Sequence, residues 1–324
     1  MKKRLIAGIG IFIMVSLIGG CQLSSKEYLA FQDIASSAGT SIDSRLSQAD
    51  FFAKDLVIIK EEENQGEDEK LTSGSSLLVN ITDKKIIYAD NVYDRLYPAS
   101  LTKLMTALVV LQYGELTDTV TVSYNASHIT EIGAKLCGFE EGDTISMDAL
   151  LKSLLVYSGN DAAVAIADHI GGNEDDFVAL MNEGAKKIGA VHTNFVNSNG
   201  LHDTDQYTTA YDMYLIFNEL MKYDTFCSII STNSYTAKYK DSKGNDKEKT
   251  FEATNAYLQG EAVAPERIQV IGGKTGTTSK AGNCLVLLSK DGSDKSYISV
   301  IMKAPDRASL YSQMTYMLSF IKSE

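Results

Sequence analysis

A serine and a lysine three positions apart are the residues best suited to covalent chemistry. Ser100 and Lys103 lie in the first turn of a helix predicted over Pro98–Tyr113, and residues i and i+3 of a helix share one face. A serine hydroxyl is a weak nucleophile without an adjacent base, and lysine acts as a base only when burial or another cation lowers its pKa. The same spacing recurs at Ser319 and Lys322, near the end of a predicted helix. The pair alone is therefore a weak signal.

Two further polar residues, Ser158 and Asn160, stand at a break between two predicted helices. A hydroxyl and an amide on such a short loop can relay a proton and hold a substrate carbonyl. The same Ser-x-Asn spacing starts at Ser123 and at Ser231. By itself the pattern is therefore more simply interpreted as a helix cap.

A lysine beside a hydroxyl and glycines forms the third group, Lys274, Thr275, Gly276 and Thr277, at the end of a β-branched run. Glycines in a strand allow a ligand to approach the backbone closely, while the lysine and threonine can bind a carboxylate. The alternative interpretation is a glycine-rich turn with a solvated lysine.

Composition limits the classes of function. The 324 residues carry 30 basic and 42 acidic side chains, a net charge of -12. An acidic chain has no electrostatic attraction to nucleic acid, so we expect no nucleic-acid partner. The histidines and the cysteines at 137, 227 and 284 lack metal-ligand spacing, so we expect no metal and no cofactor. Those three cysteines are best interpreted as buried thiols, although one disulfide among them is an open alternative.

The first twenty residues have the layout of an export signal. Three cationic residues precede the apolar stretch Leu5–Gly20, which is shorter than the roughly 20 residues of a spanning helix. The stretch ends before Cys21, and this junction resembles the bacterial lipoprotein processing box. The resemblance implies a signal peptide over 1–20, a lipid on Cys21 and a tether over 21–50 that holds a domain of residues 51–324 at the outer face of the cell membrane. An ordinary signal peptide with an incidental cysteine is the alternative.

The rest of the chain predicts an α+β fold: an antiparallel β-sheet flanked by helices, with a helical subdomain. The acidic stretch 61–70 is expected to be a solvated loop. Strands are expected at 51–59, 76–81, 85–89, 268–271, 282–289 and 296–302, and helices at 98–113, 146–156, 161–170, 174–188, 209–222 and 307–322.

In this order, the three polar groups resemble the motifs of penicillin-binding proteins and serine β-lactamases. The flanking residues are similar to those of the low-molecular-mass D-alanyl-D-alanine carboxypeptidases, a family with a β-lactamase/transpeptidase-like fold. The similarity extends over roughly residues 51–321. The matching segments are Tyr97–Ala107, Ser158–Ala163, Phe195–Leu201 with Tyr207–Ala210, and Gly272–Thr278 with Ala281–Asn283.

The resemblance implies an enzyme that removes the terminal D-alanine from peptidoglycan stem peptides and is acylated by β-lactams. Position by position, it makes Ser100 the nucleophile and Lys103 the base, which a nearby lysine cation helps to keep neutral. It assigns proton relay and substrate positioning to the Ser158 and Asn160 pair. It assigns the terminal carboxylate to Lys274 and Thr275, and the oxyanion to the backbone N–H groups of Ser100 and Thr277.

Two departures from the family pattern stand out. An arginine commonly precedes an aromatic residue near the C-terminal helix, whereas Leu310 precedes Tyr311 here and Arg307 is the nearest arginine. Many relatives also continue into a β-domain with an amphipathic membrane helix, and the chain stops at Glu324. The alternatives are an endopeptidase or transpeptidase, a β-lactamase, and a penicillin-binding sensor without activity.

Overall fold

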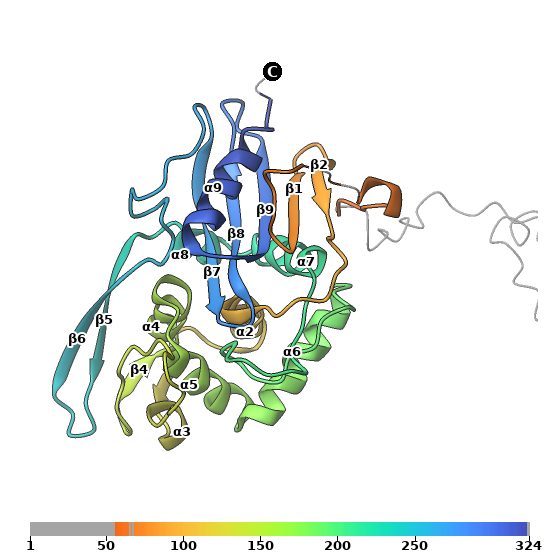
Figure 1. Ribbon diagram of the computed structural model, residues 1–324. Helices are drawn as coiled ribbons and strands as arrows, with labels where there is room; N and C mark the ends of the chain where they lie inside the picture. Colours follow the sequence, from red (N-terminus) through yellow and green to blue (C-terminus); the bar gives the residue numbers. More distant parts are fainter. Residues whose placement is uncertain (1–55, 65, 67, 323–324) are drawn as a thin grey trace, which may run out of the picture. The chain divides into compact units, whose positions relative to one another are not determined.

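Strands and helices are largely segregated along the described residues, as in other α+β proteins: two strands, a mainly helical stretch with two short strands, five strands and a final helix (Figure 1). The structure is a computed structural model that describes residues 56–64, 66 and 68–322. The signal peptide, Cys21, the tether and the start of the predicted domain at residue 51 lie outside the described residues. No helix in the described part of the chain has the length and apolarity needed to cross a membrane.

A five-stranded antiparallel sheet has the order β2-β1-β9-β8-β7. Its first two strands form one hairpin, and the last three strands of the chain form a meander that pairs with β1. The strands are β1 (Ser75–Asn80), β2 (Lys85–Asp90), β7 (Gln269–Thr278), β8 (Gly282–Lys290) and β9 (Ser296–Ala304). The meander thus brings the third motif, on β7, to one edge of the sheet.

Side chains alternate between the two faces of this sheet, and both faces are buried. On one face, Leu287 and Ile301 pack with Leu310 and Met314 of α9 (Arg307–Leu318). On the other face, Val286 and its neighbours pack into the core shared with α2 (Thr102–Tyr113) and α7 (Ala210–Leu220). The sheet therefore lies between α9 and a helical layer, as Figure 1 shows.

The helical half carries the first two motifs and a second small sheet of order β3-β4-β5-β6. Its two longer strands form a hairpin that extends beyond the helices in Figure 1. These elements are α3 (Tyr124–Ser127), α4 (Met147–Lys152), α5 (Asn160–Gly171), α6 (Glu174–Lys187), α8 (Asp224–Ile230), β3 (Thr119–Thr121), β4 (Thr144–Ser146), β5 (Ser234–Lys240) and β6 (Asp246–Glu252).

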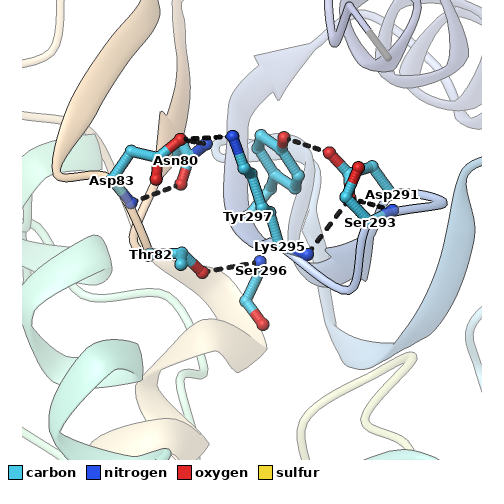
Figure 2. A network of polar contacts seen from close by, with 8 residues as sticks. All are labelled: Asn80, Thr82, Asp83, Asp291, Ser293, Lys295, Ser296 and Tyr297. Atoms are coloured by element: carbon cyan, nitrogen blue, oxygen red, sulfur yellow. Dashed lines mark hydrogen bonds and ion pairs between the residues drawn. The ribbon is translucent and has the colours of Figure 1, made fainter. Parts of the chain in front are cut away.

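Two turns at one end of the large sheet are joined by polar contacts (Figure 2). The ammonium of Lys295, after the β8–β9 turn, lies 2.9 Å from the carboxylate of Asp83 in the β1–β2 turn. The hydroxyl of Tyr297, on β9, donates to Asp291 in the β8–β9 turn at 2.7 Å. The Ser296 N–H donates to Thr82 at 2.9 Å, so this bond and the Lys295–Asp83 pair link two turns that are far apart in sequence.

The predicted strand over 51–59 is wrong in its described part, since residues 56–59 form no strand. Val57 and Ile59 are nevertheless buried. Their backbone groups bond to tyrosine hydroxyls rather than to a neighbouring strand: the Val57 N–H donates to Tyr214 at 2.8 Å, and its carbonyl accepts from Tyr211 at 3.1 Å. The β-branched run therefore correctly predicts that these residues are buried, but not that they pair with a neighbouring strand.

Other differences concern element ends. The helix predicted over 146–156 begins at the expected cap, where the Ser146 hydroxyl accepts from the Ala149 N–H, but it changes to a π-helix over Ser153–Tyr157. The acidic loop contains a short exposed 3-10 helix, Glu61–Glu63. Three cysteines, at 137, 227 and 284, are free thiols, and those at 137 and 284 are buried.

Candidate active site

The nucleophile candidate and its base candidate lie at the start of α2, where the chain passes from a 3-10 turn (Ala99–Leu101) into the α-helix. The Lys103 side chain is fully buried, and its Nζ lies 3.2 Å from Ser100 Oγ. The same ammonium donates to Asn160 Oδ1 at 2.6 Å and to the carbonyl of Asn199. Three acceptors from three segments therefore fix the amine beside the Ser100 hydroxyl.

The second and third motifs meet through another buried lysine. Lys274, on β7, is fully buried and donates to Ser158 Oγ at 2.8 Å and to the carbonyl of Thr275 at 2.8 Å. The Thr275 hydroxyl in turn lies 2.5 Å from that of Thr254. β7 and the segment that carries Thr254 thus place an amine and two hydroxyls beside the loop that carries Ser158 and Asn160.

Burial governs the charge of both lysines. Desolvation lowers the pKa of Lys103 to about 7, although the carboxylate of Asp161 opposes this change. Burial also lowers the pKa of Lys274 well below its ordinary value, with a further contribution from the charge on Lys103. The expected repulsion between the two amines helps to lower the pKa of Lys274, whereas the lowered pKa of Lys103 is mainly due to burial.

Two residues at the motifs hold strained backbone conformations. Ala99, directly before the nucleophile candidate, has φ +47°, and Ser158 has φ +73° at the end of the π-helix. A residue with a Cβ is uncommon in this region, and π-turns and strained residues concentrate at functional sites. The surrounding contacts therefore hold the two hydroxyls where relaxed backbone would not place them.

Two glycines allow segments to approach Ser100 closely. A Cβ on Gly276 would lie 3.0 Å from the backbone nitrogen of Ser100, so β7 runs directly against the nucleophile turn. On the other side, a Cβ on Gly200 would lie 2.0 Å from the carbonyl oxygen of Ala99, and its φ is +86°. The adjacent carbonyl of Asn199 is the one that accepts from Lys103. The asparagine–glycine segment is therefore part of the site.

A cleft of about 330 Å³ opens over Ser100. None of the described residues that line it carries a carboxylate, which is notable in a chain with net charge -12. The lining residues are Ser100, Gly133, Lys135, Ser158, Thr254, Thr275, Gly276, Thr277, Asn283, Arg307, Leu310 and Tyr311. The cleft is therefore suited to an anionic ligand.

Arg307 reaches the cleft rim, but it is committed to another partner. Its guanidinium lies 2.7 Å from the carboxylate of Glu261 and over the ring of Tyr311, and both members of the ion pair are more than half exposed. An exposed pair of this kind is weak. The arginine is thus present at the cleft, one helical turn before the position usual for the family.

All eight residues predicted from the motifs gather around this cleft. Lys103, Asn160 and Lys274 are buried beneath it, and the other five line it. Among those five, Thr277 is exposed, and its hydroxyl donates to Asn283 Oδ1 at 3.1 Å. The predicted lipidation residue Cys21 is outside the described residues.

Motif reasoning missed three contributors. Thr254 and Lys135 line the cleft from segments without a recognisable pattern. Asp161 is buried, and its carboxylate accepts from the backbone N–H groups of Cys137 at 2.8 Å and Gly138 at 2.7 Å. Only Asp161 offered a signal, since an acidic residue directly after a polar loop motif is a candidate for holding neighbouring backbone.

Comparison with known proteins agrees with this geometry. Residues 61–306 match the family described as D-alanyl-D-alanine carboxypeptidase. The carboxypeptidase DacF of Bacillus subtilis is 32% identical over 77% of this chain and 62% of its own length, and DacC of Escherichia coli is 34% identical over 70% and 56%. The chain therefore spans about three fifths of the length of these relatives.

Solved structures share the fold. The Streptomyces K15 DD-transpeptidase has a TM-score of 0.72 and 27% identity, covering 79% of this chain and 98% of its own. Penicillin-binding protein 5 of Haemophilus influenzae has a TM-score of 0.69 and 30% identity, covering 79% and 72%. With the family match spanning most of the described residues, this chain belongs to the D-alanyl-D-alanine carboxypeptidase family and has its transpeptidase-like fold.

Proposed function

We propose that this chain is a serine-type D-alanyl-D-alanine carboxypeptidase that removes the terminal D-alanine from peptidoglycan stem peptides. The observation that carries the proposal is the fully buried Lys103 amine, 3.2 Å from Ser100 Oγ and with a pKa lowered to about 7. A lysine with this pKa is about half neutral at pH 7, which suits a general base at that pH.

In the proposed reaction, Ser100 Oγ attacks the carbonyl carbon between the two terminal D-alanines while Lys103 takes its proton. The negative charge that develops on the carbonyl oxygen is stabilised by the backbone N–H groups of Ser100 and Thr277. The C–N bond then breaks, the leaving D-alanine amine receives the proton through Ser158, and the peptide remains as an ester on Ser100. Water hydrolyses this ester and restores the hydroxyl.

The terminal carboxylate binds Lys274 and Thr275. The absence of carboxylates among the described lining residues supports this assignment, as does the proximity of Lys274 to Ser158. A bound carboxylate favours the charged form of Lys274. The charged amine then holds the end of the peptide beside Ser158, to which Lys274 already donates.

Penicillin carries a carboxylate and a reactive amide at a similar spacing, so it acylates the same serine. A β-lactamase needs rapid hydrolysis of that ester, and class A enzymes use a glutamate for it. Among the described residues that line the cleft there is no glutamate or aspartate, which favours a slowly hydrolysed adduct. The likeness to the Streptomyces K15 DD-transpeptidase favours transfer to an amine as a second activity of the same acyl-enzyme.

The proposal includes attachment to the outer face of the cell membrane through a lipid on Cys21. The cationic start, the short apolar stretch and the small residues before the cysteine support it. Two or three acyl chains would provide stable anchoring, at about 0.8 kcal/mol for each buried methylene.

The decisive experiment follows D-alanine release from a peptide ending in D-Ala-D-Ala, together with covalent labelling by penicillin. We expect release by the unaltered chain and a one-to-one adduct on Ser100. Ser100→Ala should lose both, whereas Ser319→Ala, at the second serine–lysine pair, should keep both. Equal labelling of the Ser100→Ala variant would refute the assignment, and rapid turnover of a chromogenic cephalosporin would favour a β-lactamase.

A further inference from the structure

Lys135 is a cation in the cleft that the proposed reaction does not use. It lies between α3 and β4, is exposed, and lines the cleft together with Ser100 and Ser158. Its backbone carbonyl accepts from the N–H of Asn160 at 2.8 Å. The segment that carries Lys135 is therefore attached directly to the second motif.

The position of this segment is fixed further by a buried carboxylate. Asp161 accepts from the backbone N–H groups of Cys137, Gly138 and Phe139, which follow Lys135 in the chain. Backbone held by a buried, charge-assisted acceptor moves less than an ordinary surface loop. The Lys135 side chain thus starts from a well-defined point on the cleft wall.

The ammonium has a defined place as well. Lys135 Nζ lies 4.1 Å from the centroid of the Tyr157 ring, a distance typical of a cation–π interaction. Among the described residues no carboxylate forms an ion pair with it, although the chain has 42 acidic residues. Desolvation lowers the pKa of Lys135 although the residue keeps contact with solvent, and an anion bound beside it would favour the charged ammonium.

The two sides of the cleft have different basic residues. On the β7 side, Thr275 lines the cleft and Lys274 is buried next to it, and this pair is assigned to the terminal carboxylate. Lys135 is on the wall of the second motif, close enough for its charge to lower the pKa of Lys274. A substrate bound between the walls therefore meets a second cation beside the groups that hold its acyl part.

We infer that Lys135 binds a second anionic group, a carboxylate carried on the acyl side of the bond that Ser100 attacks. This inference rests on the proposed function. It narrows the substrates to peptides that carry a free carboxylate on the acyl side of the bond that Ser100 attacks. Lys135 is then a specificity-determining residue, and its effect depends on the charge of the ligand.

Two penicillins that differ by one carboxylate test this directly. Carbenicillin is benzylpenicillin with an added carboxylate on its acylamino side chain, the part that corresponds to the acyl side of the peptide. Rates of Ser100 acylation by each are measured by mass spectrometry of the intact protein. In Lys135→Gln we expect the ratio of the carbenicillin rate to the benzylpenicillin rate to fall about fivefold, the scale of a partly exposed ion pair.

Three controls accompany this variant. Lys135→Arg should keep the ratio, because the positive charge remains. Lys243→Gln, at the exposed tip of the β5–β6 hairpin, removes the same charge far from the cleft lining and should leave the ratio unchanged. Raising the ionic strength should reduce the ratio of the unaltered chain toward that of Lys135→Gln.

Two outcomes overturn the inference. An unchanged ratio in Lys135→Gln means that the lysine does not contact the added carboxylate. An equal loss of rate with both penicillins means that Lys135 only holds the loop through Tyr157. Failure of the proposed function has a different signature: the unaltered chain would release no D-alanine from peptides with or without the extra carboxylate, while the penicillin ratio would still decide the role of Lys135.

Discussion

Acylation of Ser100 should rise with pH as Lys103 loses its proton. The perturbation is a pH series from 5.5 to 9.5 with benzylpenicillin, whose carboxylate stays ionised throughout. Burial lowers the pKa of Lys103 from 10.5 to about 7, which corresponds to about 5 kcal/mol at 1.36 kcal/mol for each tenfold change. The neutral, active form increases with pH, so it is about 9% of the total at pH 6 and about 90% at pH 8. We therefore expect an approximately tenfold rise in rate between these values and a plateau above pH 8.

The shape of the profile separates this explanation from its rivals. A lysine with its ordinary pKa would make the rate climb about tenfold for each pH unit through pH 9.5, with no plateau. A rate independent of pH between 6 and 8 would mean that Lys103 is not the base. The control is Lys103→Arg, whose guanidinium cannot accept a proton, so acylation should fall by about 10²- to 10⁴-fold at every pH.

Three further predictions concern the supports of the site and its anchor. Gly200→Ala should destabilise the chain by more than Gly244→Ala. Both positions carry the strain of a positive φ, but an added Cβ at Gly244, where φ is +84°, would have no atom within 4 Å. Equal urea midpoints for the two variants would contradict the clash argued at Gly200. Asp161→Ala should lower the free energy of unfolding by about 2–4 kcal/mol and slow acylation, because it leaves the backbone donors of Cys137–Phe139 without their acceptor. Unchanged stability in thermal unfolding would refute this. Cys21→Ser should abolish incorporation of a labelled fatty acid and release the chain from the membrane fraction, and retained label would exclude the cysteine as the attachment site.

Short-range pattern predicted much of the architecture. The Ser146 cap, the helices over α5, α6 and α7 and the three C-terminal strands follow from signals within a dozen residues. The β5–β6 hairpin was missed because its strands are largely exposed and highly charged, so they lack the buried alternation that identifies a strand. The strand expected over 51–59 failed for a related reason, since a buried β-branched run can satisfy its backbone through side chains as well as through a sheet.

The motifs themselves were readable because their residues are close in the chain. Ser100 and Lys103 are three apart, and helix geometry alone brings them onto one face. The other contacts of the site are long-range: Lys103 with Asn160 is separated by 57 residues, and Lys274 with Ser158 by 116. No local rule brings such pairs together, so only their joint resemblance to a known family pointed to a common site.

Sequence alone determined which chemical groups are present, their order, and the local elements that carry them. Tertiary structure decided their ionisation, because the pKa of Lys103 depends on the atoms that bury it and those come from distant segments. It also decided that Lys135 and Thr254 reach the cleft, since a residue outside any motif gains a role only from the chain packed against it. Spacing encodes local geometry, whereas desolvation and proximity across the fold are properties of the packed chain.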